Sequence, residues 1–149
     1  MPGGAIAVAS DHAGFDLKEI LKRDLQEAGH EVLDLGTNST QSVDYPDFGR
    51  ALADVIASGQ AARGVLVCGS GIGISIAANR NPMVRAALVH DVTAARLARE
   101  HNDANVVAFG QRMIGPETAR EALKVFLSTE FEGGRHVGRV AKLSKGCTK

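Results

Sequence analysis

The stretch GVLVCGSGIGISIAAN, residues 64–79, joins a short apolar run to a glycine-rich loop and then to a second apolar segment. An uninterrupted apolar run of this length is typical of a strand that is buried on both faces of a parallel sheet. We therefore predict a strand over Gly64–Val67 and a helix that opens with Gly73–Asn79. A buried strand that leads directly into a helix is the unit from which α/β folds are built.

The same alternation runs along the whole chain. Further strands are predicted at Ala5–Ala9, Val32–Leu35, Ala86–Val89 and Val106–Phe109, and helices at Leu17–Ala28, Pro46–Gly59, Asp91–Glu100 and Pro116–Leu127. Residues 1–149 are expected to form one domain, a three-layer α/β/α sandwich around a five-stranded parallel sheet. The fold is Rossmann- or flavodoxin-like, with the strand order 2-1-3-4-5 and a basic, helical C-terminal tail from about residue 133.

Such a sheet has a preferred place for a ligand. Ligands bind beyond the carboxyl ends of the strands where the strand order reverses, which is here between the first and third strands. The loops Ser10–Gly14 and Cys68–Ile74 are therefore the expected binding loops.

The composition excludes several classes of protein. With 149 residues, 17 Lys plus Arg and 17 Asp plus Glu, the chain has no formal net charge, which disfavours a general nucleic-acid binder. No apolar stretch approaches the roughly 18 residues of a membrane span, and the N-terminus is typical of a first strand rather than an export signal. We therefore expect a cytoplasmic protein without nucleic-acid or membrane partners, whose Cys68 and Cys147 are free thiols. No Cys/His cluster has zinc spacing, so neither a metal nor another cofactor is predicted.

The charge is nevertheless unevenly placed. No acid follows Glu132, whereas five bases do: Arg135, Arg139, Lys142, Lys145 and Lys149. In a helical tail, Arg135 and Arg139 lie one turn apart on one face, where two guanidinium groups suit a phosphate. A solvated basic face is the alternative for the arginines, and a solvated or subunit-facing tail is the simplest interpretation of the three lysines. Arg112, after the fifth strand, returns to the expected ligand face.

The loop Cys68–Ser75 carries the most specific chemical pattern. Its three alternating glycines allow the backbone to approach a ligand closely, and the free N–H groups of the helix start favour an anion or a developing oxyanion. The same N–H groups favour the thiolate of Cys68. The loop matches neither a P-loop nor a dinucleotide fingerprint, which needs glycine where Ile74 stands. A cysteine-phosphatase loop would need arginine at that position. A merely packed cysteine beside a tight turn is the alternative.

Two polar pairs stand near the ends of strands. Asp11 either caps the next helix or contacts a polar ligand together with His12, and their position opposite Cys68 favours the ligand. His101 and Asn102 precede the fifth strand, at the amino end of the sheet and away from Cys68. His101 is therefore either a structural residue at a helix end or part of a neighbouring subunit's site, and the residues alone leave both open.

Together these motifs resemble those of a known family. Asp11-His12-Ala13-Gly14, Asp44-Tyr45-Pro46, the stretch 68–79, His101-Asn102-Asp103 and Gly133-Gly134-Arg135-His136 stand in the same order in type B ribose-5-phosphate isomerases of the RpiB/LacAB sugar-phosphate isomerase family. The resemblance spans almost the whole chain, and five motifs in register are far more specific than any one of them.

The resemblance implies a metal-free aldose–ketose isomerase of the pentose phosphate pathway, which interconverts D-ribose 5-phosphate and D-ribulose 5-phosphate through an enediolate. It implies a homodimer whose sites are shared between subunits, with a higher oligomer left open. In it, Cys68 resembles the base, His101 the group that opens the sugar ring, and Ser70 a further catalytic residue. The implied substrate contacts are Asp11, His12, Gly69, Ser70, Gly71, Ile72, Gly73, Asn102, Arg112, Arg135 and Arg139, with the arginines mainly at the phosphate. Some members place a glutamate base where Ile74 stands, so the chain resembles the cysteine subclass.

Two alternatives remain open. The same chemistry serves other phosphosugars, such as galactose 6-phosphate or allose 6-phosphate, with a different pocket around residues 38–45. A non-catalytic phosphosugar-binding module on the same fold is the second alternative, but it gives Cys68 and His101 no purpose.

Overall fold

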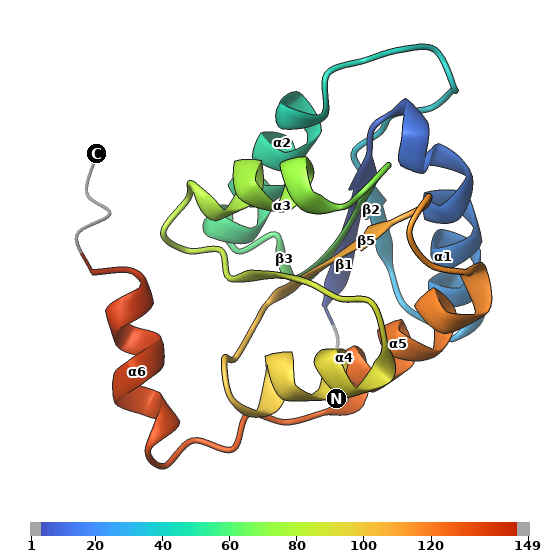
Figure 1. Ribbon diagram of the computed structural model, residues 1–149. Coiled ribbons are helices and arrows are strands. Elements are labelled where there is room, and N and C mark those ends of the chain that lie inside the picture. The colour runs from blue at the N-terminus through green and yellow to red at the C-terminus, as the bar shows by residue number, and fades with distance from the viewer. Residues whose placement is uncertain (1–3, 146–149) are drawn as a thin grey trace.

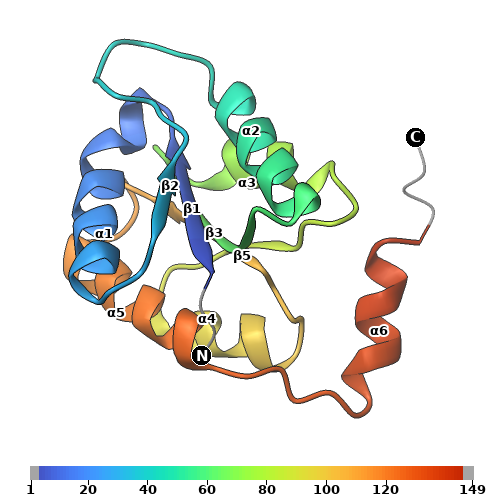
Figure 2. The same ribbon diagram turned by 180° about the vertical axis from the view of Figure 1, so that it is seen from behind.

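The computed structural model describes residues 4–145 and has the predicted three-layer α/β/α architecture around a five-stranded parallel sheet (Figures 1 and 2). The strands are β1 (Ala5–Ser10), β2 (Val32–Asp34), β3 (Ala61–Cys68), β4 (Ala86–Leu88) and β5 (Val106–Gly110). The helices are α1 (Phe15–Glu27), α2 (Tyr45–Ser58), α3 (Ile72–Asn79), α4 (Val92–Glu100), α5 (Pro116–Ser128) and α6 (His136–Leu143), and a short 3₁₀ turn, η1 (His12–Gly14), precedes α1. Cys147 and Lys149 lie outside the described residues. Within residues 4–145, no helix has the length and apolar character to cross a membrane.

The strands lie in the order β2-β1-β3-β5-β4, so the order predicted for the last two strands is wrong. β5 pairs with β3 from Gly64↔Val106 to Cys68↔Gly110, and its five residues are all buried. β4 has three half-buried residues and lies at the edge. The longer and more apolar strand takes the interior position because both of its faces and both of its sides are covered there.

Two hydrophobic cores lie on the two faces of the sheet. Helices α1, α4 and α5 cover one face, where Val8 and Phe109 pack with Leu21. Helices α2 and α3 cover the other face, where Ala7 packs with Leu52. Because successive side chains of a strand point to opposite faces, β1 contributes its valine to the first core and its small alanines to the second.

An ion pair between a buried lysine and a partly accessible carboxylate ties α1 to β2. Lys18 on α1 is fully buried, and its Nζ lies 2.8 Å from Oδ1 of Asp34. Asp34 also accepts hydrogen bonds from Lys22 Nζ at 2.8 Å and from the N–H of Gly36 at 2.9 Å. Burial acts to raise the pKa of Asp34, but the hydrogen bonds from Lys18 and Lys22 outweigh it and hold this pKa below its usual value. The pair therefore fixes the start of the loop that leads from β2 to α2.

The C-terminal helix α6 stands apart from the sandwich in both views (Figures 1 and 2). At its start, the ring of His136 stacks on His101, with the ring centroids 4.5 Å apart. After its end, Ser144 Oγ donates to the carbonyl of Pro82 at 2.9 Å. The basic tail is thus a helix that is held near both ends, while most of its residues are exposed.

Candidate active site

The carboxyl ends of β1, β3 and β5 meet closely at one edge of the sheet. The N–H of Asp11, after β1, donates to the carbonyl of Val67 at 3.3 Å. A Cβ atom at Gly14 would lie 2.5 Å from the backbone of Val67, and one at Gly110 would lie 2.5 Å from the backbone of Ser70. Side chains at these glycines would push the segments apart. The two predicted binding loops therefore lie side by side.

Cys68 ends β3 at this edge and is 4% exposed. Its Sγ accepts a hydrogen bond from the N–H of Gly71 at 3.1 Å. Gly71 precedes α3 with a φ of +78°, and a Cβ atom there would lie 2.6 Å from Leu88 Cδ1 and 2.9 Å from the carbonyl carbon of Phe109. Glycine satisfies both this left-handed backbone and this close packing. The N–H of Gly71 therefore points at Sγ from the turn that begins α3.

Within the loop, backbone donors and side chains are paired with one another. Ser70 Oγ accepts from the N–H of Ile72 at 3.1 Å, while the Ile72 side chain is exposed. A Cβ atom at Gly73 would collide with the ring of Tyr45. The N–H groups of Gly71 and Ile72 thus already donate to Sγ and Oγ, and an oxyanion in this loop would share these donors.

Asp11 and His12 each have one side-chain atom that accepts hydrogen bonds from backbone N–H groups. Oδ1 of the buried Asp11 accepts from the N–H groups of Ala13 at 3.0 Å and Gly14 at 3.1 Å, so the capping interpretation is confirmed for this oxygen. His12 Nδ1 accepts from the N–H of Val43 at 3.1 Å, which places the proton of a neutral ring on Nε2. Asp11 Oδ2 and His12 Nε2 are the atoms left for a ligand.

Arg112 lies beside the Cys68 loop because β5, rather than β4, neighbours β3. Its N–H donates to the carbonyl of Gly69 at 3.0 Å, and its Nη1 would lie 3.1 Å from a Cβ atom at Gly69. In the predicted strand order, β4 would have separated Arg112 from this loop. The residues that meet here, which we call the carboxyl-edge group, are Asp11, His12, Cys68–Gly73 and Arg112.

His101 and Asn102 lie at the opposite edge of the sheet. They follow α4 and precede β5, and β5 runs alongside β3 from Gly64 to Cys68. Four residue steps of about 3.3 Å put this edge at least about 13 Å from Cys68. The expectation that His101 does not reach Cys68 within one subunit is therefore confirmed.

Helix α6 places Arg135 and Arg139 at the same edge of the sheet as His101. Arg135 immediately precedes this helix, Arg139 follows one turn later, and both side chains are exposed. The residues at this edge, which we call the amino-edge group, are His101, Asn102, Arg135 and Arg139. The structure thus divides the predicted site residues of one chain into two groups at opposite edges of the sheet.

His136 lies beside the amino-edge group, although it is not among the predicted site residues. It turns inward, and its buried Nε2 lies 3.5 Å from Oε1 of Glu132 and has no hydrogen-bond partner among the described residues 4–145. Burial, followed by the charge of Arg135, lowers the pKa of His136 below its ordinary value. The ligand atoms of His101, Glu132 and His136 lie within 4.8 Å of one another. The two rings are only 16° from parallel, so they cannot direct their in-plane lone pairs at one metal ion unless they rotate. His136 therefore acts in this structure as an aromatic support for His101.

Comparison with known proteins identifies the family. The family described as ribose/galactose isomerase matches residues 6–143. The chain belongs to the ribose/galactose isomerase family. Ribose-5-phosphate isomerase B of Escherichia coli strain K12 is 43% identical over 139 residues, which are 93% of this chain and 93% of that protein. D-erythrulose-4-phosphate isomerase of Pectobacterium atrosepticum is 42% identical over 140 residues, 93% of this chain and 92% of that protein. The crystal structure of a ribose 5-phosphate isomerase from Thermotoga maritima matches with a TM-score of 0.93 and 50% identity, over 95% of this chain and 97% of that one.

Membership of the ribose/galactose isomerase family confirms both the resemblance seen in the motifs and the three-layer fold. It also shows that the protein is an aldose–ketose isomerase. Ile74 lies on α3, is fully buried in the core and carries no group that takes up a proton. Cys68 is therefore the candidate base that this chain offers in the loop.

Tyr45 is a candidate site residue that the sequence indicates only as part of the pocket around residues 38–45. Its ring packs against Gly73, and 42% of its surface is exposed. With Gly73 and Arg80 it lines a cavity of about 390 Å³ between α2 and α3. The motif Asp44-Tyr45-Pro46 could have indicated this role, because a helix start does not require an aromatic residue.

Proposed function

We propose that this chain is a metal-independent isomerase that interconverts D-ribose 5-phosphate and D-ribulose 5-phosphate. The observation that carries the proposal is the hydrogen bond from the N–H of Gly71 to Cys68 Sγ at the carboxyl edge, in a chain that is 43% identical to a ribose-5-phosphate isomerase B. A thiolate stabilised at a helix start is a base that can act on a carbon-bound proton.

The reaction moves a carbonyl between C1 and C2 of the open-chain sugar. Cys68 removes the proton from C2, and the electrons form an enediolate whose oxyanion is held by the backbone N–H groups of the loop at Gly69–Gly73. A proton passes from O2 to O1, and Cys68 returns its proton to C1. Ser70 lies within this loop and contacts the reacting oxygens. One base therefore serves both halves of the reaction.

Ring opening precedes this step because the cyclic form of ribose 5-phosphate has no carbonyl. We assign it to His101, which transfers the proton of the anomeric hydroxyl to the ring oxygen O4. Asn102 binds the sugar beside it, and Asp11 and His12 bind hydroxyl groups at the carboxyl edge through Oδ2 and Nε2. Arg112, Arg135 and Arg139 hold the phosphate, remote from the reacting carbons, so that binding energy there orients the substrate.

The site requires two subunits. Because the carboxyl-edge and amino-edge groups lie at opposite edges of one sheet, a homodimer in which each site combines one group from each subunit brings them together. Exposed apolar residues next to both groups support this arrangement: Ile72 and Ile76 on α3 are 49% and 51% exposed, and Val137 on α6 is 55% exposed. Solvent-exposed apolar residues on neighbouring turns are typical of interaction surfaces.

The second candidate is an isomerase for another phosphosugar. The 42% identity to a D-erythrulose-4-phosphate isomerase favours it, as does the exposed Tyr45 beside the loop, where a change in size would alter the pocket. Galactose 6-phosphate and allose 6-phosphate need the same proton transfer. A non-catalytic phosphosugar-binding module would bind these compounds and leave their carbon-bound protons in place.

The deciding experiment is the reaction of the purified protein with ribose 5-phosphate in D₂O. The proposal requires ribulose 5-phosphate as product and deuterium bound to carbon. Higher kcat/KM for a four- or six-carbon phosphosugar in the same assay selects the second candidate, and binding without deuterium incorporation selects the non-catalytic module.

The shared site has its own test. Cys68→Ala and His101→Ala chains are each inactive on this proposal, but a mixed dimer contains one intact site. Mixing the two variants under conditions of proven subunit exchange should restore part of the activity. No recovery would place the whole site within one subunit.

A further inference from the structure

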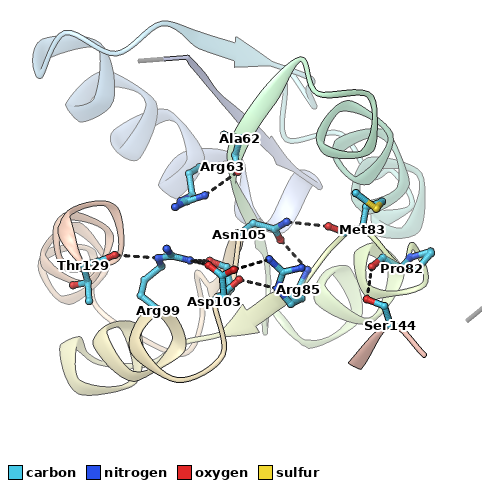
Figure 3. Close-up of polar contacts among 11 residues, drawn as sticks. Ala62, Arg63, Pro82, Met83, Arg85, Arg99, Asp103, Asn105, Thr129 and Ser144 are labelled. Carbon is cyan, nitrogen blue, oxygen red and sulfur yellow. Dashed lines mark hydrogen bonds and ion pairs between the residues drawn. The ribbon is translucent and has the colours of Figure 1, made fainter. Parts of the chain in front are cut away.

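A cluster of charged side chains surrounds Asp103 (Figure 3), the residue that follows His101 and Asn102 in the chain. Oδ1 of Asp103 accepts from Arg99 Nη1 at 2.9 Å, and Oδ2 accepts from Arg85 Nη2 at 3.3 Å. Arg85 Nε also donates to the backbone carbonyl of Asp103 at 2.8 Å. Figure 3 shows the two arginines reaching Asp103 from opposite sides. We call these three residues the Asp103 clamp.

Both arginines of the Asp103 clamp are anchored in the body of the protein. Arg99 is 3% exposed, and its Nε donates to the carbonyl of Thr129, after α5, at 3.1 Å. Its Nη1 donates to the carbonyl of Ala104 at 2.7 Å. Arg85 immediately precedes β4. The contact of Arg85 Nη2 with the carboxylate is long at 3.3 Å, but the bonds from Arg85 Nε and Arg99 Nη1 are 2.7–2.9 Å, as is typical of charged donors, so the clamp joins α4, α5 and β4 around one turn.

The clamp acts at an unusual backbone position. Asp103 has a φ of +47°, the one positive φ outside glycine within residues 4–145. Its N–H donates to the carbonyl of Arg99 at 3.2 Å, the bond that closes a helix end of the left-handed type. Glycine or asparagine usually occupies such a position because a side chain is strained there. An aspartate held by two arginines instead fixes the direction in which the chain leaves α4.

His101 and Asn102 are the two residues between α4 and Asp103. Within residues 4–145, neither of their side chains makes a hydrogen bond, and His101 is supported by the ring of His136. Asn102 is exposed and lines a cavity of about 330 Å³ together with Arg85. The backbone that the clamp fixes is therefore what places both side chains.

We propose that Asp103, held by Arg99 and Arg85, is a positioning residue that sets His101 and Asn102 in the orientation required to open the ring of the sugar. The inference rests on the proposed function, since it gives His101 the ring-opening step. Asp103 itself touches neither the substrate nor the base Cys68.

Two reactions separate ring opening from proton transfer at carbon. Ribose 5-phosphate closes to a furanose through O4, so its conversion requires ring opening. In ribulose 5-phosphate, the phosphate blocks O5 and no five-membered ring forms. Incorporation of solvent deuterium into ribulose 5-phosphate therefore depends on the base and the loop but not on ring opening.

The principal variant is Asp103→Gly, which keeps the left-handed backbone accessible and removes the carboxylate that both arginines bind, while the bond from Arg85 Nε to the backbone carbonyl of residue 103 stays possible. We expect kcat for ribose 5-phosphate to fall by about 10²-fold, with KM and the deuterium exchange into ribulose 5-phosphate little changed. Arg85→Met leaves the pair of Asp103 with Arg99 in place, so it tests the same step if Asp103→Gly does not fold. Arg85→Lys, which keeps the charge without the paired donors, should restore part of the lost kcat.

A matched control lies at the other end of the same helix. Asp91 Oδ1 accepts from the N–H of Ala94 at 2.7 Å and caps α4. Asp91→Ala weakens this helix without touching the turn at Asp103, so the ratio of conversion to exchange should stay at the wild-type value.

Three results would overturn the inference. They are an equal loss of conversion and exchange in folded Asp103→Gly or Arg85→Met protein, wild-type conversion in both variants, and wild-type conversion in His101→Ala. The proposed function fails separately, if the wild-type protein neither converts ribose 5-phosphate nor exchanges deuterium into ribulose 5-phosphate.

Discussion

The Sγ atom of Cys68 and the backbone nitrogen of Gly71 lie 3.1 Å apart, so that the last side chain of β3 accepts a hydrogen bond from the residue that precedes α3. This contact places a potential thiolate at the positive end of a helix and beside the donors of a glycine-rich loop. It joins the base and the oxyanion donors of the proposed reaction in one turn of the chain.

Replacement of Cys68 tests the base directly. We expect Cys68→Ala and Cys68→Ser to lower kcat for ribose 5-phosphate by about 10²- to 10⁴-fold, because neither side chain can take up the carbon-bound proton as a thiolate does. Deuterium exchange into ribulose 5-phosphate should fall by the same factor. Cys147→Ala, which removes the other thiol of the chain, is the control and should be active. Wild-type turnover by Cys68→Ala would show that another group is the base.

Gly71→Ala tests the shape of the loop. A Cβ atom there meets Leu88 and the Phe109 backbone at 2.6 and 2.9 Å in addition to the strain of a φ of +78°. Gly59→Ala is a matched control, because Gly59 has a φ of +83° with nothing within 4 Å of its Cβ position. Both variants should lose about 1 kcal/mol of folding free energy through backbone strain, and Gly71→Ala should lose about 1–3 kcal/mol more through overpacking. Its kcat should fall as well. Equal stability losses, measured by urea unfolding, would contradict the packing found here.

The phosphate assignment predicts a change in KM. Replacing Arg135 and Arg139 together by alanine removes charge-assisted hydrogen bonds of about 1.5–3 kcal/mol each, so KM for ribose 5-phosphate should rise by at least about 10-fold. Inhibition by inorganic phosphate should weaken in parallel. Lys142→Ala, on the same helix, is the control and should leave both constants near their wild-type values. An unchanged KM in the double variant would remove these arginines from the phosphate site.

The pair of the buried Lys18 with Asp34 predicts unequal effects of two substitutions at one site. Asp34→Asn leaves the buried ammonium group of Lys18 with the carboxylate of Glu19, 2.9 Å from Nζ, as a charged partner, and the free energy of unfolding should fall by about 1–3 kcal/mol. Lys22→Ala removes the more exposed partner of the same carboxylate and should cost less than about 1 kcal/mol. Chemical denaturation at pH 7 measures both. A smaller loss in Asp34→Asn than in Lys22→Ala would refute the importance of the pair of Lys18 with Asp34.

His136 predicts a pH dependence of stability. Burial lowers its pKa in the folded protein below the ordinary value of about 6.5, so the unfolded chain binds a proton more readily. The free energy of unfolding should therefore fall as the pH drops from 6.5 toward the folded-state pKa, and this loss should be absent above 6.5. His136→Phe keeps an aromatic ring beside His101 and removes the titration. Thermal unfolding of both proteins at pH 7.5, 6.5 and 5.5, at one protein concentration, should show a shallower loss for His136→Phe, and parallel curves would contradict a neutral, buried His136.

Much of the fold could be predicted because the apolar runs are short and the breaks between them are clear. The strand Val65–Val67 and the helix capped by Asp91 follow directly from local pattern, and Asp91 Oδ1 does accept from Ala94. The order of the last two strands could not be predicted by counting along the chain. It depends on which strand has the larger buried surface, and the fully buried Val106–Gly110 takes the interior position beside β3.

The candidate site also has parts that could be predicted from the sequence and parts that could not. The loop at Cys68 and the distance of His101 from it follow from the direction of parallel strands. The side chains that hold His101 and its turn in place could not be predicted, because they belong to distant segments. His136 lies on α6, and Arg85 is the residue before β4. Such contacts depend on tertiary packing rather than on spacing in the sequence.

The two site groups lie at opposite edges of one sheet. The rate of the proposed reaction therefore depends on the concentration of protomers. With the site shared as proposed, a lone protomer is inactive, and specific activity follows the fraction of chains that have a partner. Dilution below the dissociation constant of the pair then stops turnover. In a mixed population, a chain that lacks its own thiol still lends its histidine to a neighbour, so one defective copy inactivates half of a dimer rather than all of it.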